Sequence, residues 1–381
     1  METGLVVATD AAVITPFSGA RENGEESLWQ GLMAGRTAIG PIRRFPVDQG
    51  HYRARIASHM DDLKGSDGRS MLRDLLLRLV PEIGPVPPDS LMITATIKAG
   101  ADNLESFCHG RQAHLPDLLL SSIADIMGPA LSIDSNGICI SASCASSTIA
   151  VAHGAALIQS GRAEVVLVSC GDIITEYAFS GFSSLKALSP VPCRPFDRDR
   201  QGLSLGEGAA ALLLMSARRA RRENRNRLGT VLGWGITNDA THITAPERRG
   251  KGLVQAVRQA LNMAETDPEE ITAISAHGTG TIYNDLMELN AFRQVFGKRK
   301  IPIYSVKGAI GHTLAAAGAI EVILGFKTLS EQTAPPTVGF ENPEKGADGK
   351  VSAEPQPVSG HYLLTTNSGF GGVNAALVLG R

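Results

Sequence analysis

Several features that would point to particular functions are scarce in this sequence or absent from it. The net charge is only −2, and no basic stripe is interleaved with aromatic residues, so nucleic acid is not expected as a partner. No apolar run approaches the roughly 20 residues that span a bilayer. The first residues also lack the basic and apolar regions of a secretory signal. We therefore expect a cytoplasmic protein without a membrane partner.

Cysteine is also sparse. The chain has five cysteines, an odd number, and they are widely spread without a C-x-x-C pair. This pattern supports neither a disulfide framework nor a thiolate zinc site. We expect reduced thiols and no bound metal.

Length and hydrophobic content are sufficient for a large interior. A chain of 381 residues with 43% hydrophobic residues is long for one compact core, so two domains or two fused halves are expected. Predicted strands and helices alternate throughout, and the pattern starts again at Gly229. We therefore predict two similar α/β halves, residues 1–228 and 229–381, with mostly parallel central sheets.

Residues 137–161 form the most informative stretch. Ile138 and Ile140 alternate as in a strand, small residues predict a turn, Cys144 follows, and an alanine-rich helix comes next. The free N–H groups and dipole at a helix start favour a thiolate, which would make Cys144 a nucleophile. On this stretch alone, a small buried thiol explains the residue equally well.

The second half has a counterpart to this stretch. Residues 301–324 again predict a strand, a small-residue turn and an alanine-rich helix. Lys307 and His312 stand near the position that Cys144 occupies in the first half. The repeat supports a pseudo-symmetric pair of halves.

Four segments with unusual residues each follow a predicted strand. They are residues 143–147 (SCASS), 277–285 (HGTGTIYND), 307–312 (KGAIGH) and 367–374 (NSGFGGVN). In parallel sheets the carboxyl ends of strands share one edge, where ligands bind in open α/β folds. We therefore expect the four segments to build one site.

With these motifs the sequence resembles the β-ketoacyl-acyl-carrier-protein synthases of the thiolase-like superfamily, in particular the type II elongating enzymes. The run 194–197 (RPFD) and the run 206–208 (GEG) resemble further signatures of that family. The resemblance implies a thiolase-like fold, with two pseudo-symmetric halves layered α-β-α-β-α.

The resemblance also implies roles for individual residues. Cys144 matches the nucleophile that accepts an acyl chain as a thioester, and His277 with His312 matches the paired histidines of a Cys-His-His triad. Lys307 matches a buried lysine whose cation would keep both histidines neutral. Glu321 matches its acidic partner.

Further matches concern the substrate. Phe370 resembles a gatekeeping phenylalanine whose backbone N–H joins that of Cys144 in an oxyanion hole, and Phe182 resembles an acyl-pocket wall. Thr279 and Thr281 resemble residues that hold a phosphopantetheine arm. The matched substrate-binding glycines of the gating loop are Gly369 and Gly371.

The activity implied is decarboxylative condensation of an acyl thioester with a malonyl-acyl-carrier protein, in fatty-acid or polyketide synthesis. The phosphopantetheine arm belongs to the carrier protein, and no cofactor is expected on this chain. The implied partners are the carrier protein, docking near Lys186 and Arg69, and a second ketosynthase chain in a homodimer or heterodimer.

Two alternatives remain at this point. One is a non-catalytic partner similar to a chain-length factor, although such partners lack the nucleophile that Cys144 would supply. The other is a thiolase-like enzyme acting on acyl-coenzyme A. The gating segment also departs from the family, with Ser368 in place of a second aromatic residue and Val373 in place of a threonine. We therefore expect a gate that opens more readily than usual.

Overall fold

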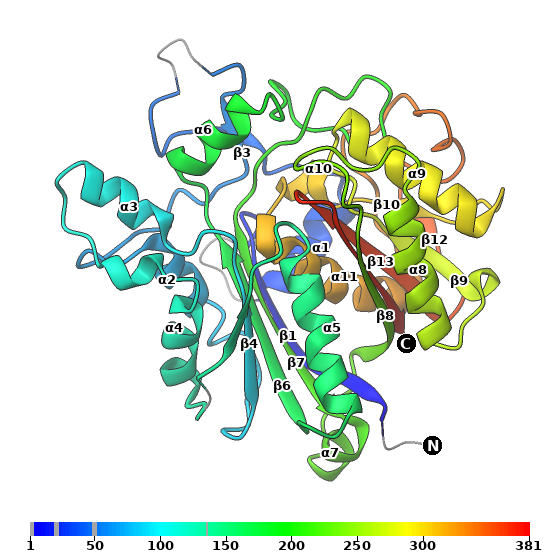
Figure 1. Ribbon diagram of the computed structural model, residues 1–381, viewed down its shortest axis with the longest axis horizontal. Coiled ribbons are helices and arrows are strands. Elements are labelled where there is room, and N and C mark those ends of the chain that lie inside the picture. Colours follow the sequence, from blue (N-terminus) through cyan, green and yellow to red (C-terminus); the bar gives the residue numbers. More distant parts are fainter. Residues whose placement is uncertain (1–3, 19–22, 48–51, 135) are drawn as a thin grey trace.

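The computed structural model describes residues 4–18, 23–47, 52–134 and 136–381. Residues 1–3, 19–22, 48–51 and 135 lie outside the described chain. Within the described ranges, ten strands form one large sheet (Figure 1). These strands are β1 (Val6–Ile14), β4 (Leu91–Ala95), β5 (Ile138–Ile140), β6 (Val165–Asp172), β7 (Gly208–Ser216), β8 (Gly229–Asn238), β9 (Ile271–Ser275), β10 (Ile303–Tyr304), β13 (Tyr362–Gly369) and β14 (Val373–Gly380). Two small pairs lie apart from it: β2 (Gly40–Pro41) with β3 (Ile56–Ala57), and β11 (Thr333–Ala334) with β12 (Gln356–Pro357).

The strand order repeats in the two halves of the chain. The first half has the order β5-β4-β6-β7-β1, the second has β10-β9-β13-β14-β8, and β1 pairs with β8 at the junction. Within each half, a pair of parallel ladders is followed by a pair of antiparallel ones. The sheet is therefore mixed rather than mostly parallel, partly because β13 and β14 are joined by a short hairpin, which only antiparallel strands allow. β8 begins at Gly229, but division into domains 1–228 and 229–381 stays a prediction.

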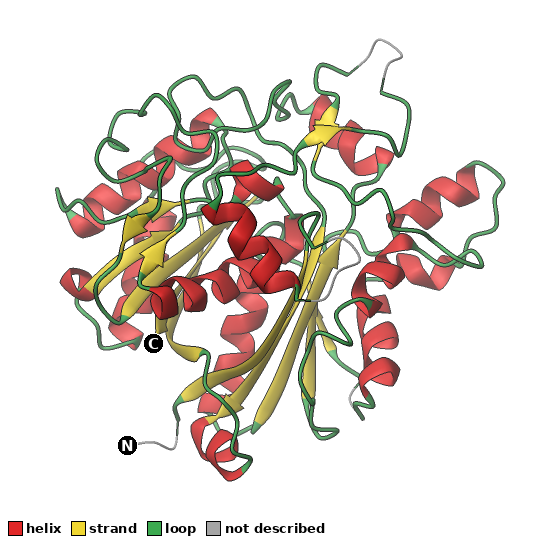
Figure 2. Ribbon diagram, turned by 180° about the vertical axis from the view of Figure 1, so that it is seen from behind, coloured by secondary structure: helices red, strands yellow, loops and turns green. Residues whose placement is uncertain are grey.

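Helices lie on both sides of the sheet (Figure 2). They are α1 (Gly24–Met33), α2 (Met71–Leu77), α3 (Ala101–Cys108), α4 (Ser122–Leu131), α5 (Ser146–Gln159), α6 (Glu176–Ser184), α7 (Ala217–Arg222), α8 (Lys251–Met263), α9 (Ile282–Phe296), α10 (Lys307–Ile310) and α11 (Ala317–Glu331), with 3-10 turns η1 (Leu115–Leu118), η2 (Pro268–Glu270) and η3 (Leu314–Ala316). Helices α5 and α11 contact each other and strands of both halves, so they form a middle layer. Helices α2 and α4 cover the outer face of the first half, and α8 with α9 covers that of the second.

The middle layer depends on small residues. Gly318 of α11 packs so closely on α5 that an added Cβ would lie 2.0 Å from Thr148 Oγ1 and 2.9 Å from Asn367 Oδ1. The Ser147 hydroxyl accepts a hydrogen bond from the backbone N–H of Ala319 (2.9 Å). These contacts bring the starts of the two helices together, and with them the turns that precede each helix.

The expected strand-turn-helix units are present, and other elements were not expected. The sequence of residues 173–200 is loop-rich and predicts no helix there, yet helix α6 lies within it. The sequence pattern did not predict α3 or β14 either. Among the described residues, no helix has both the length and the apolar character needed to cross a bilayer.

Candidate active site

Cys144 lies in the predicted turn between β5 and α5. The preceding residue, Ser143, has a left-handed backbone (φ 52°), and α5 begins two residues after Cys144 with Ala145 as its N-cap. The Ser146 hydroxyl donates to the Ser143 carbonyl (2.5 Å) and accepts from the Ala142 N–H (2.8 Å), which fixes the turn. The thiol is buried but lines a cavity.

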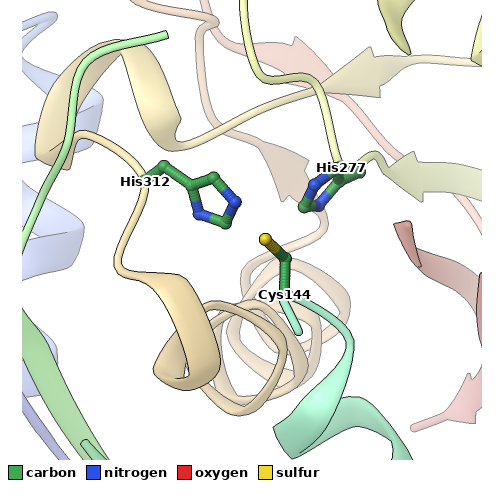
Figure 3. Close-up of side chains that lie close together, drawn as sticks. All are labelled: Cys144, His277 and His312. Carbon is green, nitrogen blue, oxygen red and sulfur yellow. The ribbon is translucent and has the colours of Figure 1, made fainter. Parts of the chain in front are cut away.

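The turn brings Cys144 close to both predicted histidines. Sγ of Cys144 and one ring nitrogen of each of His277 and His312 lie within 4.8 Å of one another. The two rings are nearly perpendicular, with centroids 5.1 Å apart. In Figure 3 the thiol points toward the space between the rings. The three residues come from segments far apart in the sequence, as the shared-edge argument predicts.

Each histidine is held by backbone contacts at the end of an element. Glu288 of α9 accepts hydrogen bonds from the N–H groups of His277 (2.8 Å) and Gly278 (2.7 Å), just after β9. Nδ1 of His312 accepts from the Leu314 N–H at the start of η3 (3.3 Å), so the ring proton of a neutral His312 is on Nε2. Nε2 is buried without a hydrogen-bond partner among the described residues and is free to donate to a ligand.

Lys307 and Glu321 form a buried ion pair beside the histidines. Nζ of Lys307 contacts Oε1 of Glu321 (2.5 Å) and donates to the carbonyl of His277 (2.5 Å). Burial, followed by the Lys307 charge, lowers the pKa of both His277 and His312 well below the usual value. Both imidazoles are therefore neutral at physiological pH and can act as N–H donors.

The positive charge of Lys307 also disfavours metal binding at this site. One thiol and two imidazoles are ligand types that zinc accepts. A divalent ion on Cys144, His277 and His312 would, however, lie close to the charge of Lys307, which it would repel. The arrangement therefore suits an oxyanion better than a metal.

The acidity of the Cys144 thiol differs from that expected for a cysteine at a helix start. Burial raises the pKa of Cys144 to about 12, and the Lys307 charge opposes the increase only in part. Burial therefore works against the thiolate that the helix start was expected to favour, because the charged form loses its hydration. Cys144 is a neutral thiol at rest.

A cavity of about 430 Å³ opens onto these residues. Of the predicted residues, it is lined by Cys144, Phe182, Lys186, His277, Thr279, Thr281, His312, Gly369 and Phe370. The rings of Phe182 and Phe370 pack at a centroid distance of 5.8 Å. The hydroxyls of Thr279 and Thr281 hydrogen-bond each other (2.8 Å) at the wall of the cavity.

The predicted gating loop is a tight hairpin turn between β13 and β14. The last ladder pair is Gly369 with Val373, so the turn consists of residues 370–372. Ser143 donates through Oγ to the Phe370 carbonyl (2.9 Å), and the N–H of Gly371 donates to the Ile243 carbonyl (2.6 Å). Among the residues that the structure describes, neither the Phe370 N–H nor the Cys144 N–H donates to another residue. Both N–H groups are therefore available for an oxyanion.

The two residues predicted for docking lie in different places. Lys186 lines the cavity that contains Cys144, whereas Arg69 lines a separate surface cavity and binds Asp117 through an ion pair of 2.9 Å. Gly371 lies in the hairpin turn but does not line the cavity with Cys144. The structure thus groups Lys186 with the site and leaves Arg69 apart.

Residues that the sequence did not single out complete the site. Asn367 contacts His277 and Glu321, and Glu288 holds the backbone of His277. Burial raises the pKa of Glu288 to about 7. Asn367 stands in one of the four unusual segments, but nothing in its spacing indicates which side chains it meets.

Known proteins place this site in a family. Residues 118–220 match the family model described as Beta-ketoacyl synthase, N-terminal domain, and residues 228–341 match Beta-ketoacyl synthase, C-terminal domain. A 3-oxoacyl-(acyl-carrier-protein) synthase 2 from Synechocystis sp. is 30% identical over 99% of this chain and 98% of its own length. The chain belongs to the beta-ketoacyl synthase family.

Other relatives and solved structures match this chain over nearly its full length. A 3-oxoacyl-(acyl-carrier-protein) synthase 2 from Coxiella burnetii is 28% identical over 100% of this chain and 99% of its own length. The solved ishigamide ketosynthase/chain length factor matches with a TM-score of 0.89 and 27% identity, covering 100% of this chain and 99% of that one. A ketosynthase in complex with its chain length factor from Xenorhabdus doucetiae matches with a TM-score of 0.85 and 27% identity, covering 99% and 98%. These ketosynthases confirm the predicted family and its fold.

Proposed function

We propose that this synthase joins an acyl group held on Cys144 to a malonyl unit delivered by an acyl carrier protein, with loss of carbon dioxide. The observation that carries the proposal is the meeting of Cys144, His277 and His312 within 4.8 Å in one cavity. The relatives are named as synthases that act on carrier-protein substrates, which supports the same substrate class here.

The first step loads the acyl chain. Sγ of Cys144 attacks the acyl thioester, a new C–S bond forms, and the carrier thiol leaves with the proton from Cys144. The tetrahedral oxyanion accepts hydrogen bonds from the backbone N–H groups of Cys144 and Phe370. Because the buried thiol has a high pKa, this proton transfer takes place within the step rather than as a preceding ionisation.

The second step forms the new carbon–carbon bond. The C–C bond to the malonyl carboxylate breaks, carbon dioxide leaves, and the electron pair forms an enolate whose oxygen accepts hydrogen bonds from His277 and His312. The enolate carbon attacks the thioester on Cys144, and the C–S bond breaks to release the elongated product. The thiolate of Cys144 then regains a proton from water.

The arrangement of Cys144, His277 and His312 also argues against the two alternative functions, a non-catalytic partner and a thiolase-like enzyme. A partner similar to a chain-length factor would not require a thiol, yet Cys144 meets both histidines in the cavity. A thiolase-like reaction on coenzyme A thioesters would use a second thiol as acid or base. In the described chain, the group within 4.8 Å of Cys144 contains no second cysteine. Decarboxylative condensation therefore remains the function that the site supports best.

The test uses an acyl-carrier protein, a malonyl-carrier protein and the purified chain. We expect one acyl adduct on the wild type by intact-mass spectrometry and none on Cys144→Ala. The variants His277→Ala and His312→Ala should keep the adduct but release labelled carbon dioxide from the malonyl substrate on the order of 10² to 10³ times more slowly. An equal adduct on Cys144→Ala, or wild-type decarboxylation by either histidine variant, would refute the proposal.

A further inference from the structure

Asn367, on β13, is fully buried and meets three other elements of the active site. Its Nδ2 lies 2.7 Å from Oε2 of Glu321 on α11 and 3.1 Å from Nδ1 of His277. Its Oδ1 accepts a short hydrogen bond from the hydroxyl of Thr148 on α5. One amide therefore connects the nucleophile's helix, the buried ion pair and one of the two histidines.

The contact with Glu321 fixes the orientation of this amide. The Glu321 carboxylate is paired with Lys307 and can only accept hydrogen bonds. The opposite amide orientation would place the Asn367 oxygen 2.7 Å from Oε2 of Glu321, so that two acceptor oxygens would be in contact with no proton between them. The NH₂ group of Asn367 therefore faces Glu321, and the oxygen faces Thr148, whose hydroxyl supplies the donor.

This orientation determines which nitrogen of His277 carries the proton. One N–H of Asn367 donates to Glu321, and the other donates to Nδ1 of His277. A nitrogen that accepts a hydrogen bond has no proton of its own, so the single ring proton of a neutral His277 is on Nε2. His312 reaches the same tautomer differently, because its Nδ1 accepts from a backbone N–H.

We propose that Asn367 is a positioning residue that holds His277 as the Nε2–H tautomer, so that both histidines present a donor to the enolate oxygen. The inference rests on the proposed function for its use in catalysis, but the tautomer itself depends only on the contacts of Asn367. The alternative role is purely structural, with Asn367 serving only to connect α5, α11 and β13. The two roles differ in what happens to His277 when the amide is changed without loss of volume.

Two substitutions separate these roles. Asn367→Leu keeps the volume and removes the donor to Nδ1, so both tautomers of His277 become populated. Asn367→Asp places an acceptor beside Nδ1, which favours a proton there and removes it from Nε2. The matched control is Thr148→Val, which removes the third contact of the amide and leaves the donation to His277 in place.

The first readout is kinetic. We expect decarboxylation of the malonyl substrate to fall on the order of 10² to 10³-fold in Asn367→Asp, as for loss of one oxyanion donor. The loss in Asn367→Leu should be smaller, because part of His277 keeps its proton on Nε2. Loading of the acyl group onto Cys144 should change less than about fivefold, since it uses backbone donors. In Thr148→Val, decarboxylation should stay within about fivefold of the wild type. Equal losses in loading and decarboxylation would indicate a structural role and overturn the proposal.

The second readout is independent of activity. Nitrogen NMR of the ¹⁵N-histidine-labelled protein, with His277 assigned by comparison with His277→Gln, reports which ring nitrogen is protonated. We expect Nε2 in the wild type and Thr148→Val, and a shift toward Nδ1 in Asn367→Asp. A proton on Nδ1 in the wild type would overturn the proposal even if no variant folds. Failure of the wild type to decarboxylate malonyl substrate would instead refute the proposed function and leave the tautomer to be decided by NMR.

Discussion

At the scale of single residues, the site combines a cysteine at a helix start with a poorly acidic thiol. Cys144 stands at a turn before a helix, where a thiolate is usually stabilised. Its burial removes most of the water that would solvate the negative charge, and its pKa is about 12. In the proposed mechanism, the nucleophile is therefore generated together with proton transfer and not by a preceding ionisation.

The high pKa of Cys144 predicts how its rate of alkylation changes with pH. Alkylation of Cys144 by iodoacetamide should accelerate about tenfold per unit between pH 7 and 10, because the thiolate fraction keeps rising until the pH reaches the folded pKa. An ordinary thiol, with a pKa of about 8.5, levels off in this range. Intact-mass spectrometry gives the rate, and Cys144→Ala supplies the background of the other thiols. A plateau at or below pH 9 would mean that the helix start dominates over burial.

The sequence predicted the reactive residues better than their surroundings. Cys144, His277 and His312 stand in motifs with recognisable spacing after strands, and the structure brings them together. Asn367 acts through partners from α5, α11 and the segment after β9. These contacts of Asn367 depend on how the helices of the middle layer pack, and a local sequence pattern does not specify that packing.

At the scale of elements, the alternation of strands and helices was predictable because buried strands and alanine-rich helices have clear periods. Helix α6 was not, since its sequence EYAFSGFSS mixes polar and aromatic residues without an apolar face that repeats. Whether neighbouring strands run parallel or antiparallel could not be predicted from the sequence either. It depends on whether a connection crosses the sheet or turns back as a hairpin, and β13 with β14 does the latter.

The hairpin turn at Phe370 permits a test of gating. Its ring is only partly buried and packs on Phe182, so Phe370→Ala should lower the free energy of unfolding by about 1 kcal/mol, less than the roughly 3 to 5 kcal/mol of a core phenylalanine. If the ring closes the site until an acyl group arrives, the variant should bind malonyl substrate before loading and condense more slowly.

Melting temperature measured beside pre-steady-state loading and condensation rates distinguishes the two roles of Phe370. A large loss of stability with an unchanged rate per folded molecule would exclude the gate. The variant Ser143→Ala is a useful companion, because it removes the hydrogen bond to the Phe370 carbonyl and keeps the ring. It should ease opening of the loop without the loss of packing.

At the scale of the whole molecule, one surface exposes several large apolar side chains. It lies over α3, η1 and the edge strand β5, where Phe107 and Leu119 are each 59% exposed and Ile138 is 45% exposed. The Cys139 thiol donates to the Leu120 carbonyl (3.2 Å), which joins the edge strand to this surface. Among the described strands β5 pairs only with β4, and an edge strand with apolar neighbours favours association, for which we expect a second ketosynthase-type chain.

The association can be tested with Ile138→Asp. We expect the mass by light scattering to fall from that of two chains to that of one, because a carboxylate on the edge strand would be desolvated in the interface. Leu228→Asp, at a similarly exposed apolar residue on another surface, should leave the dimer intact. A wild-type dimer without other chains indicates a homodimer, and a dimer seen only after co-production with a related subunit indicates a heterodimer. An active wild-type monomer in both situations would contradict the prediction.

The repeated strand order has a consequence for how chemical roles are divided. The two halves resemble duplicated units, and the turns before α5 and α11 occupy equivalent places in them. In the proposed mechanism, one unit contributes the covalent carrier, Cys144, and the other contributes the imidazole donors of His277 and His312, so neither holds a complete set. A change at the first turn alone would remove covalent chemistry while the second unit kept its donors and its packing. From such a scaffold, a subunit that only shapes a cavity is a few substitutions away from one that catalyses.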